Sequence, residues 1–173
     1  VQISSDTEKN FALRSAVYLQ QEVVVQATRA GENSAMASSQ MNREEIAAVN
    51  FGQDIPVLLN MLPSVVSTSD AGAGVGYTGI RIRGTDATRI NVTVNGIPIN
   101  DAESQGVFWV NMPDFASSVQ SIQVQRGVGT STNGAGAFGG SVNMQTDGLR
   151  DSAFTDFMLS AGSFNTRRVT LKT

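Results

Sequence analysis

The stretch that decides the fold is residues 125–146, which read QRGVGTSTNGAGAFGGSVNMQT. It is a loop dense in glycine that runs directly into residues 141–145, where apolar and polar residues alternate as in a β-strand. Glycine at this density allows close approach of the backbone and positive φ angles, and it adds little to a packed core. The stretch therefore predicts a tight structural turn that leads into a strand.

The same glycines offer a second interpretation, a nucleotide site. Gly134, Gly136 and Gly139 match the spacing of the dinucleotide-binding fingerprint. That motif needs a helix opened by its last glycine, whose N-terminus holds the pyrophosphate, and an acidic residue about 20 positions on. Here a strand follows the glycines. Because the phosphate would then lack its helix N-terminus, we favour the structural turn.

Composition excludes several kinds of catalytic site. The 173 residues include no histidine and no cysteine. This excludes Ser-His-Asp and Cys-His nucleophilic sites, zinc sites made of thiolates or imidazoles, and disulfide bonds. The nearest carboxylate pair is Asp101 with Glu103, which we keep as the alternative of an acid–base enzyme. We expect no catalytic residues, no metal site and no cofactor.

The charge and hydropathy patterns bear on partners and location. The net charge is −3 and the only lysines are Lys9 and Lys172, so we expect no nucleic-acid partner, which would need clustered basic residues. The sequence contains no apolar run of about 18 residues, and it does not begin like a signal peptide. Abundant glycine and small polar residues are typical of an exported β-rich protein, whose signal would have been removed.

Residues 42–62 have the apolar spacing of two short helices. Asn42 is a possible N-cap with Glu45 three residues later, and Asp54 begins a second segment. The apolar residues of that segment, spaced i, i+3, i+4 and i+7, are Ile55, Leu58, Leu59 and Leu62. Pro63 ends it. We expect this face to pack in the core, with a surface for a partner helix as the alternative.

From Gly79 onward apolar residues recur every second position, as in strands. The segments with this spacing are 80–83, 90–94 and 97–99, followed by the pairs Ile122 with Val124 and Val142 with Met144. Asn95-Gly96 between two such segments predicts a hairpin, and residues 113–118 suggest one helical turn. Together the expected helices and strands predict an α+β fold, a small mixed β-sheet with short flanking helices.

The two ends of the chain differ from this middle part. Glu22–Ala27 is a short β-branched run before small polar residues, and we weigh an edge strand of this domain against a peptide that pairs with another protein's sheet. Residues 154–160 and 166–171 alternate like two strands around a turn at Gly162. Large plugged transporters have about 22 strands, so this end is at most the beginning of a barrel.

Residues 22–150 as an ordered set resemble the plug domain of TonB-dependent outer-membrane receptors. The resemblance rests on three motifs, namely IRIRG at 80–84 with RINVTVNGIPI at 89–99, residues 119–146, and residues 22–27 in the position of a TonB box. It implies a fragment of a plugged transmembrane β-barrel protein. The implied divisions are 1–21, the tail of an N-terminal extension domain of Bacteroidetes type; 22–40, TonB box and flexible tether; 41–150, the plug; and 151–173, the beginning of the β-barrel.

The resemblance also implies roles for individual residues. The TonB-binding residues are Glu22, Val23, Val24, Val25, Gln26 and Ala27. Those facing acidic groups on the barrel wall are Arg81, Arg83, Arg89 and Arg126, for which a simple polar sheet face is the alternative. Loops at the extracellular apex give the ligand-binding candidates Tyr77, Asp101, Gln105 and Asn133. Gln123 stands where the family usually carries glutamate, and Asn133-Gly134 where an aromatic-glycine pair is common.

The implied function is transport without catalysis. The plug would close the lumen of its own barrel in the outer membrane, with the N-terminus in the periplasm, and help to bind an extracellular small molecule, most often a ferric siderophore or other iron complex. The TonB C-terminal domain would pull the tether, pairing with it edge to edge. The alternatives are the enzyme above and a free-standing periplasmic or surface module for ligand binding or adhesion.

Overall fold

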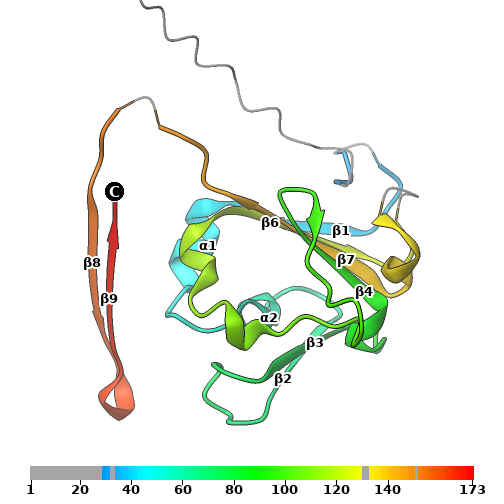
Figure 1. The fold of residues 1–173 in the computed structure, drawn as a ribbon, viewed down its shortest axis with the longest axis horizontal. Helices are drawn as coiled ribbons and strands as arrows, with labels where there is room; N and C mark the ends of the chain where they lie inside the picture. The colour runs from blue at the N-terminus through cyan, green and yellow to red at the C-terminus, as the bar shows by residue number, and fades with distance from the viewer. Residues whose placement is uncertain (1–28, 32–33, 130–132, 151) are drawn as a thin grey trace, which may run out of the picture.

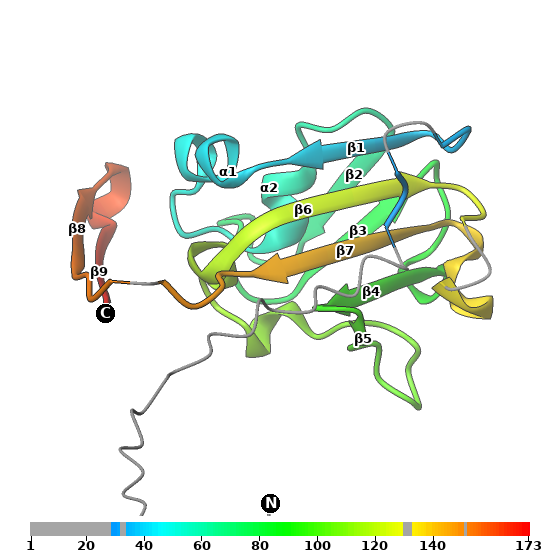
Figure 2. The same ribbon diagram turned by 90° about the horizontal axis from the view of Figure 1, so that it is seen from above.

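The computed structural model describes residues 29–31, 34–129, 133–150 and 152–173 (Figures 1 and 2). The predicted TonB-binding residues 22–27 and the predicted extension tail 1–21 lie outside the described residues. Predictions about them therefore stay predictions.

The described residues form nine strands, two α-helices and several short 3-10 helices. The strands are β1 (Ser38–Met41), β2 (Val65–Ser69), β3 (Thr78–Ile82), β4 (Ile90–Val94), β5 (Ile97–Pro98), β6 (Val119–Arg126), β7 (Gly140–Thr146), β8 (Asp156–Ala161) and β9 (Arg167–Lys172). The helices are α1 (Arg43–Val49) and α2 (Ile55–Leu59). Neither has the length and hydrophobicity that a membrane span needs, and the same holds for every helix in the described part of the chain.

The central sheet has five strands in the order β1-β6-β7-β4-β5. Strand β4 runs parallel to β7, whereas the other neighbours are antiparallel, so the sheet is mixed. Two separate two-stranded pairs, β2 with β3 and β8 with β9, complete the fold. The α+β fold with a small mixed sheet and short helices is thus confirmed. The β8–β9 hairpin stands beside α1 at one end of the sheet (Figures 1 and 2).

Both helices begin where the sequence predicts. The Asn42 side chain accepts a hydrogen bond from the Glu45 backbone N–H, and the Glu45 side chain accepts one from the Asn42 N–H, which is a complete capping box. At α2 the Asp54 side chain makes no cap bond. Its carboxylate is buried and accepts hydrogen bonds from the Gly76 N–H at 3.0 Å and the Thr78 hydroxyl at 2.8 Å. Asp54 therefore ties α2 to the loop before β3.

Both helices lie on one side of the sheet (Figure 2), and the hydrophobic core lies between them and that face. Its buried side chains come from both helices, from the sheet, from β3 and from the 3-10 helix Trp109–Asn111, and they include Ile46, Ile55, Leu58, Leu59, Ile82, Ile90, Val92, Trp109, Ile122, Val124, Val142 and Met144. Burial of the α2 face confirms its packing in the protein's own core. Removal of this apolar area from water, at about 25 cal/mol per Å², is what holds the helices to the sheet.

Three local features differ from the predictions or extend them. Arg83 lies beyond the end of β3 with φ 52°, so it belongs to a turn and does not continue the predicted alternation. The sequence does not predict strand β2, because Val65-Val66-Ser67-Thr68-Ser69 has little hydrophobic contrast. Strand β1 takes up residues assigned to the tether, since Ser38–Met41 pair with β6.

The Asn95-Gly96 hairpin is confirmed, with φ of 51° and 81° as in a type I′ turn.

Candidate functional site

The sheet face opposite the helices is buried although its side chains are polar. Paired residues of neighbouring strands point to the same side of a sheet, so the registers place Thr93, Asn143 and Gln123 in one row and Asn91, Ser141 and Gln125 in the next. All six are 8% exposed or less. Buried polar groups need hydrogen-bond partners, and within the first row the Thr93 hydroxyl donates to Asn143 Oδ1 at 2.7 Å.

A short chain segment, residues 29–31, lies across this polar face. In Figure 2 it crosses β6 and β7 on the side away from α2. The Ala30 N–H donates to Gln123 Oε1 at 2.7 Å, and Gln123 Nε2 donates back to the Ala30 carbonyl at 3.0 Å. The Arg29 guanidinium donates to the backbone carbonyls of Ser121 and Asn143, both at 3.2 Å. Burial lowers the pKa of Arg29 from its ordinary value. The segment is thus held by hydrogen bonds to β6 and β7.

Further amides extend this contact along the sheet. Gln125 Nε2 donates to Gln123 Oε1 at 3.1 Å, and Asn133 Nδ2 donates to Gln125 Oε1 at 3.1 Å. Gln123, Gln125 and Asn133 are 4%, 1% and 3% exposed. We call these three side chains the amide row. It connects the start of the turn before β7 with the segment that contains Ala30.

The glycine-rich stretch behaves as the predicted structural turn. The residues after Gly134 form a four-residue 3-10 turn, Ala135–Phe138, and then β7, so no α-helix follows the fingerprint glycines. A Cβ on Gly139 would lie 2.0 Å from Thr85 Oγ1 and 3.1 Å from the Arg89 carbonyl. One on Gly140 would lie 2.5 Å from the Gln125 carbonyl. The two glycines are therefore needed for close backbone approach.

The four arginines predicted to face a barrel wall do not share one environment. Arg81 is exposed and lies 4.0 Å from Asp86, and the Arg89 guanidinium lies over the Phe138 ring at 5.8 Å. Arg83 is exposed in its turn, with its guanidinium against Gly127. Arg126 is half-buried and donates to Ser39 Oγ at 2.7 Å, which joins β6 to β1. Their predicted role toward a barrel stays a prediction.

The predicted ligand-binding residues divide into exposed and buried ones. Tyr77, Asp101 and Gln105 are exposed on loops, and Gln105 has φ 60°. Asn133 is buried in the amide row. Asp101 accepts hydrogen bonds from the Ser104 backbone N–H at 2.7 Å and from the Ser104 hydroxyl at 2.9 Å. These two bonds hold the pKa of Asp101 below its ordinary value. The Asp101 carboxylate thus stabilises the turn between Asp101 and Ser104.

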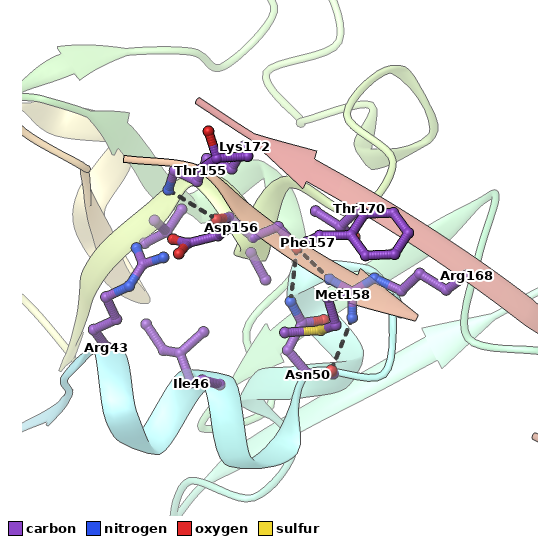
Figure 3. A pocket seen from close by; sticks show the side chains of 14 residues that line it. Arg43, Ile46, Asn50, Thr155, Asp156, Phe157, Met158, Arg168, Thr170 and Lys172 are labelled. Atoms are coloured by element: carbon purple, nitrogen blue, oxygen red, sulfur yellow. Dashed lines mark hydrogen bonds between the residues drawn. The ribbon is translucent and has the colours of Figure 1, made fainter. Parts of the chain in front are cut away.

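The β8–β9 hairpin has one polar face, and that face meets the rest of the molecule. Arg168 contacts the Asp114 carboxylate at 2.9 Å and donates to the Asn50 backbone carbonyl at 3.0 Å. Asp147 pairs with both Lys172 of the hairpin and Arg43 of α1. A cavity of about 510 Å³ lies between α1 and the hairpin (Figure 3). Ion pairs thus join the β8–β9 hairpin to the sheet domain.

The other face of the hairpin is apolar and uncovered. It consists of the register pairs Phe157 with Leu171 and Leu159 with Val169, all more than 60% exposed. Alternation of a lumen-facing polar side with an outward apolar side is the pattern of a membrane β-strand.

In the part of the chain that the structure describes, no group of three or more acidic residues is placed to hold a metal ion.

The sequence does not predict the residues that join the hairpin to the sheet domain, nor the contact of Gln123 with residues 29–31. Asp114, Asp147, Arg168 and Lys172 belong to no motif, and each pair is far apart in sequence. In the sequence Gln123 stands out only as a departure from the family pattern. A usable signal existed in the alternation Ser121-Ile122-Gln123-Val124-Gln125, in which every residue on one side of a central strand is polar and uncharged. Such a strand needs hydrogen-bonding partners above it.

The comparisons with known proteins agree with this architecture. Residues 30–141 match the family model of the TonB-dependent receptor plug domain. Over 116 residues the chain is 33% identical to the vitamin B12 transporter BtuB of Vibrio vulnificus (strain YJ016), covering 66% of this chain and 18% of that protein.

Solved structures give the same picture. The siderophore receptor PirA of Acinetobacter baumannii superposes with a TM-score of 0.53 at 27% identity, covering 65% of this chain and 17% of that one. The siderophore receptor PiuA of the same organism does so with 0.59 at 24% identity, covering 80% and 18%. The chain thus spans about a fifth of the length of these relatives. It belongs to the family of TonB-dependent receptor plug domains.

Proposed function

We propose that this chain closes the barrel lumen of an outer-membrane receptor and couples ligand uptake to TonB. The carrying observation is the docking of residues 29–31 on the polar sheet face, one residue beyond the predicted TonB-binding residues 22–27. The outer membrane holds no useful ion gradient, so uptake against a concentration difference needs force from the inner membrane. A segment held by a few hydrogen bonds is suited to transmit and yield to such force, because each net contribution is only about 1 kcal/mol.

The hairpin supports a barrel around this domain. Its exposed apolar face, made by Phe157, Leu159, Val169 and Leu171, would lie against lipid once neighbouring strands are present. A free-standing periplasmic module would leave these side chains in water, and this is an argument against that alternative. We infer that the protein resides in the outer membrane with its N-terminus in the periplasm.

The ligand we propose is an iron complex, such as a ferric siderophore. The support is the similarity to siderophore receptors, with 27% identity to PirA. The curated relative at 33% identity is a vitamin B12 transporter, so cobalamin is the competing ligand. Uptake of radiolabelled ferric siderophores and of radiolabelled cyanocobalamin by cells that carry only this receptor distinguishes the two ligands.

An enzyme is not supported by the geometry. The candidate acid–base pair would need one carboxylate free to exchange a proton. Asp101 instead accepts hydrogen bonds from the backbone N–H groups of Glu103 and Ser104, so its carboxylate is engaged in its own turn. The relatives described above are a transporter and receptors. We infer that this chain, too, acts in transport.

The coupling is tested by capture on an immobilised TonB C-terminal domain. The complete receptor is compared with Val24→Pro, which removes a backbone donor from the strand that must pair with TonB. We expect at least a tenfold loss of capture. Val17→Pro, outside the predicted TonB-binding residues, is the control and keeps capture. Equal capture of the receptor and the Val24→Pro variant would refute coupling through residues 22–27.

A further inference from the structure

Two asparagines of this chain are followed directly by glycine, in Asn95-Gly96 and Asn133-Gly134. Asparagine in this position is open to a covalent change, because glycine has no Cβ and its backbone nitrogen can approach the side-chain carbonyl carbon of the preceding residue. Attack at that carbon closes a succinimide ring and releases ammonia. In a folded protein the reaction depends on how firmly the side-chain amide is held and on whether water reaches it. The two sites differ in both respects.

Asn95 lies in the turn of the β4–β5 hairpin and is exposed. Its Oδ1 accepts a hydrogen bond from the Thr146 backbone N–H at 3.0 Å, and its Nδ2 donates to Thr146 Oγ1 at 2.8 Å. We call these two exposed bonds the Asn95–Thr146 contact. Gly96 lies outside the register pairs of β4 with β5, so the strand ladder does not take up its N–H. The attacking nitrogen is therefore available, and the contact with Thr146 holds the amide that it would attack.

Asn133 has the opposite surroundings. It is 3% exposed, and its Nδ2 donates to Gln125 Oε1 at 3.1 Å. A Cβ on Gly129 would lie 2.6 Å from this Nδ2, so the backbone at Gly129 covers the amide closely. Ring closure would have to move the amide against this packing, and opening of the ring needs water, which burial keeps away. The fold therefore protects Asn133.

A third dipeptide, Asp147-Gly148, could form the same ring from a carboxyl group. Asp147 pairs with both Arg43 and Lys172, and these two cations favour its ionised form. A carboxylate is a poor acceptor for a backbone nitrogen, because its negative charge repels the nucleophile. This leaves Asn95 as the reactive site among the three.

We propose that Asn95 is a site of spontaneous deamidation and that its contact with Thr146 sets the rate. The Gly96 nitrogen forms a bond to Asn95 Cγ and loses its proton, while Nδ2 takes up a proton and leaves as ammonia. Water then opens the succinimide to aspartate or isoaspartate. No reactant other than water is needed, and the inference does not depend on the proposed function.

The two products should differ in their effect on the sheet. Aspartate still accepts from the Thr146 N–H, and the Thr146 hydroxyl can turn and donate to it. In isoaspartate the former side-chain carbonyl becomes part of the backbone, so the contact with Thr146 is lost. The turn also becomes one carbon longer, which disturbs the pairing of Val94 with Ile97. Isoaspartate therefore damages the β4–β5 hairpin more than aspartate does.

The test follows both asparagines in the complete receptor. Folded receptor and receptor unfolded in guanidinium chloride are incubated in mildly alkaline buffer, and peptide mapping by mass spectrometry measures aspartate and isoaspartate at each site. The unfolded sites should react at similar rates, whereas in the folded receptor Asn95 should react about fivefold faster than Asn133 or more. Equal rates in the folded receptor, a faster reaction at Asn133, or no conversion of Asn95 while the unfolded sample reacts fully would overturn the proposal.

The role of Thr146 is tested by a pair of substitutions. Thr146→Val removes the acceptor of Asn95 Nδ2 and keeps the backbone N–H. It should raise the rate at Asn95 about fivefold, the factor expected for one lost hydrogen bond. Thr146→Ser keeps the hydroxyl and should react like the parent. Thr68→Val, the same change at an exposed position of β2, is the matched control and should alter neither rate.

The rate at Asn133 shows whether Thr146→Val is still folded. Unfolding would raise the rates at Asn95 and Asn133 together, whereas loss of the contact alone raises only that at Asn95. A parallel rise at both sites, or an unchanged rate at Asn95, would overturn the role of Thr146. Failure of the proposed function appears elsewhere, as TonB capture that does not depend on residues 22–27, and it leaves these rates unaffected.

Discussion

The two faces of the central sheet are equally buried, but different chemistry buries them. On the helix side Ile122, Val124 and Val142 are 0% exposed and pack against α1 and α2. On the other side Gln125 and Asn143 are 1% and 2% exposed and are held by hydrogen bonds. Apolar burial stabilises without directional requirements, whereas a buried amide stabilises only while its partners stay in place. One face therefore holds the domain together, and the other can respond to displacement.

The largest loss of stability is expected from a cavity on the apolar face of the sheet. Ile122→Ala should lower the free energy of unfolding by about 3 kcal/mol, because Ile122 is fully buried and the surrounding core relaxes only in part. A urea titration of the chain, followed by fluorescence of Trp109, measures this. The control Gln120→Ala, exposed on the same strand, should change the value by no more than about 0.5 kcal/mol. Similar losses in both variants would contradict the comparison.

A somewhat smaller effect is expected where β7 first meets β6. A methyl group on Gly140 would lie 2.5 Å from the Gln125 carbonyl, and this contact with backbone cannot be relieved by a side-chain rotation. Gly140→Ala should therefore cost about 2 kcal/mol in the same titration. Gly136→Ala is the matched control, since a methyl group there meets nothing within 4 Å. If both substitutions cost the same, close approach at Gly140 does not shape the sheet.

The polar face should show a smaller and non-additive effect. Thr93→Val should cost about 1 kcal/mol, because Asn143 loses the hydroxyl that donates to its Oδ1. Adding Asn143→Leu should recover part of this loss, since replacing both partners by apolar groups removes the unpaired acceptor. Additive losses in this double-mutant cycle would show that the pair is not a hydrogen-bonded unit.

The smallest expected effect is a pH dependence of the exposed turn at Asp101, which belongs to neither face of the sheet. Hydrogen bonds from Ser104 lower the pKa of Asp101, so the turn is stabilised above the ordinary aspartate pKa and loses this stabilisation as pH falls through the lowered value. The amide signal of Ser104 in a ¹⁵N-resolved NMR titration should therefore change at a pH below the usual aspartate range. The Asp101→Asn variant should show no such transition. A midpoint at or above the ordinary value would contradict this.

Local signals explain which parts could be predicted from the sequence. The capping box at Asn42 and Glu45 and the hairpin at Asn95-Gly96 depend on neighbours within a few residues, and both are present. The alternation of β4, β6 and β7 likewise marked the core side of the sheet. The parallel register of β4 with β7 could not be read this way, because it depends on residues about 50 positions apart.

The candidate site was harder to predict for the same reason. The contact of Gln123 with Ala30 spans 93 residues, and that of Arg168 with Asp114 spans 54. Periodicity tells which side of a strand is polar, but not which distant groups will meet it. The predicted residues Tyr77, Asp101 and Gln105 lie on exposed loops, where the sequence carries turn signals and no information on a ligand.

The position of β1 sets the order in which a load from the N-terminus would be felt. This strand follows the docked segment and lies at the margin of the sheet, where β6 is its single neighbour among the described residues. It can peel away while the ladders β6–β7 and β7–β4 stay intact. The stretch 29–41, about 13 residues at roughly 3.5 Å each, would then unspool to about 45 Å. The protein could thus lengthen by this amount under load before the central strands of the sheet separate.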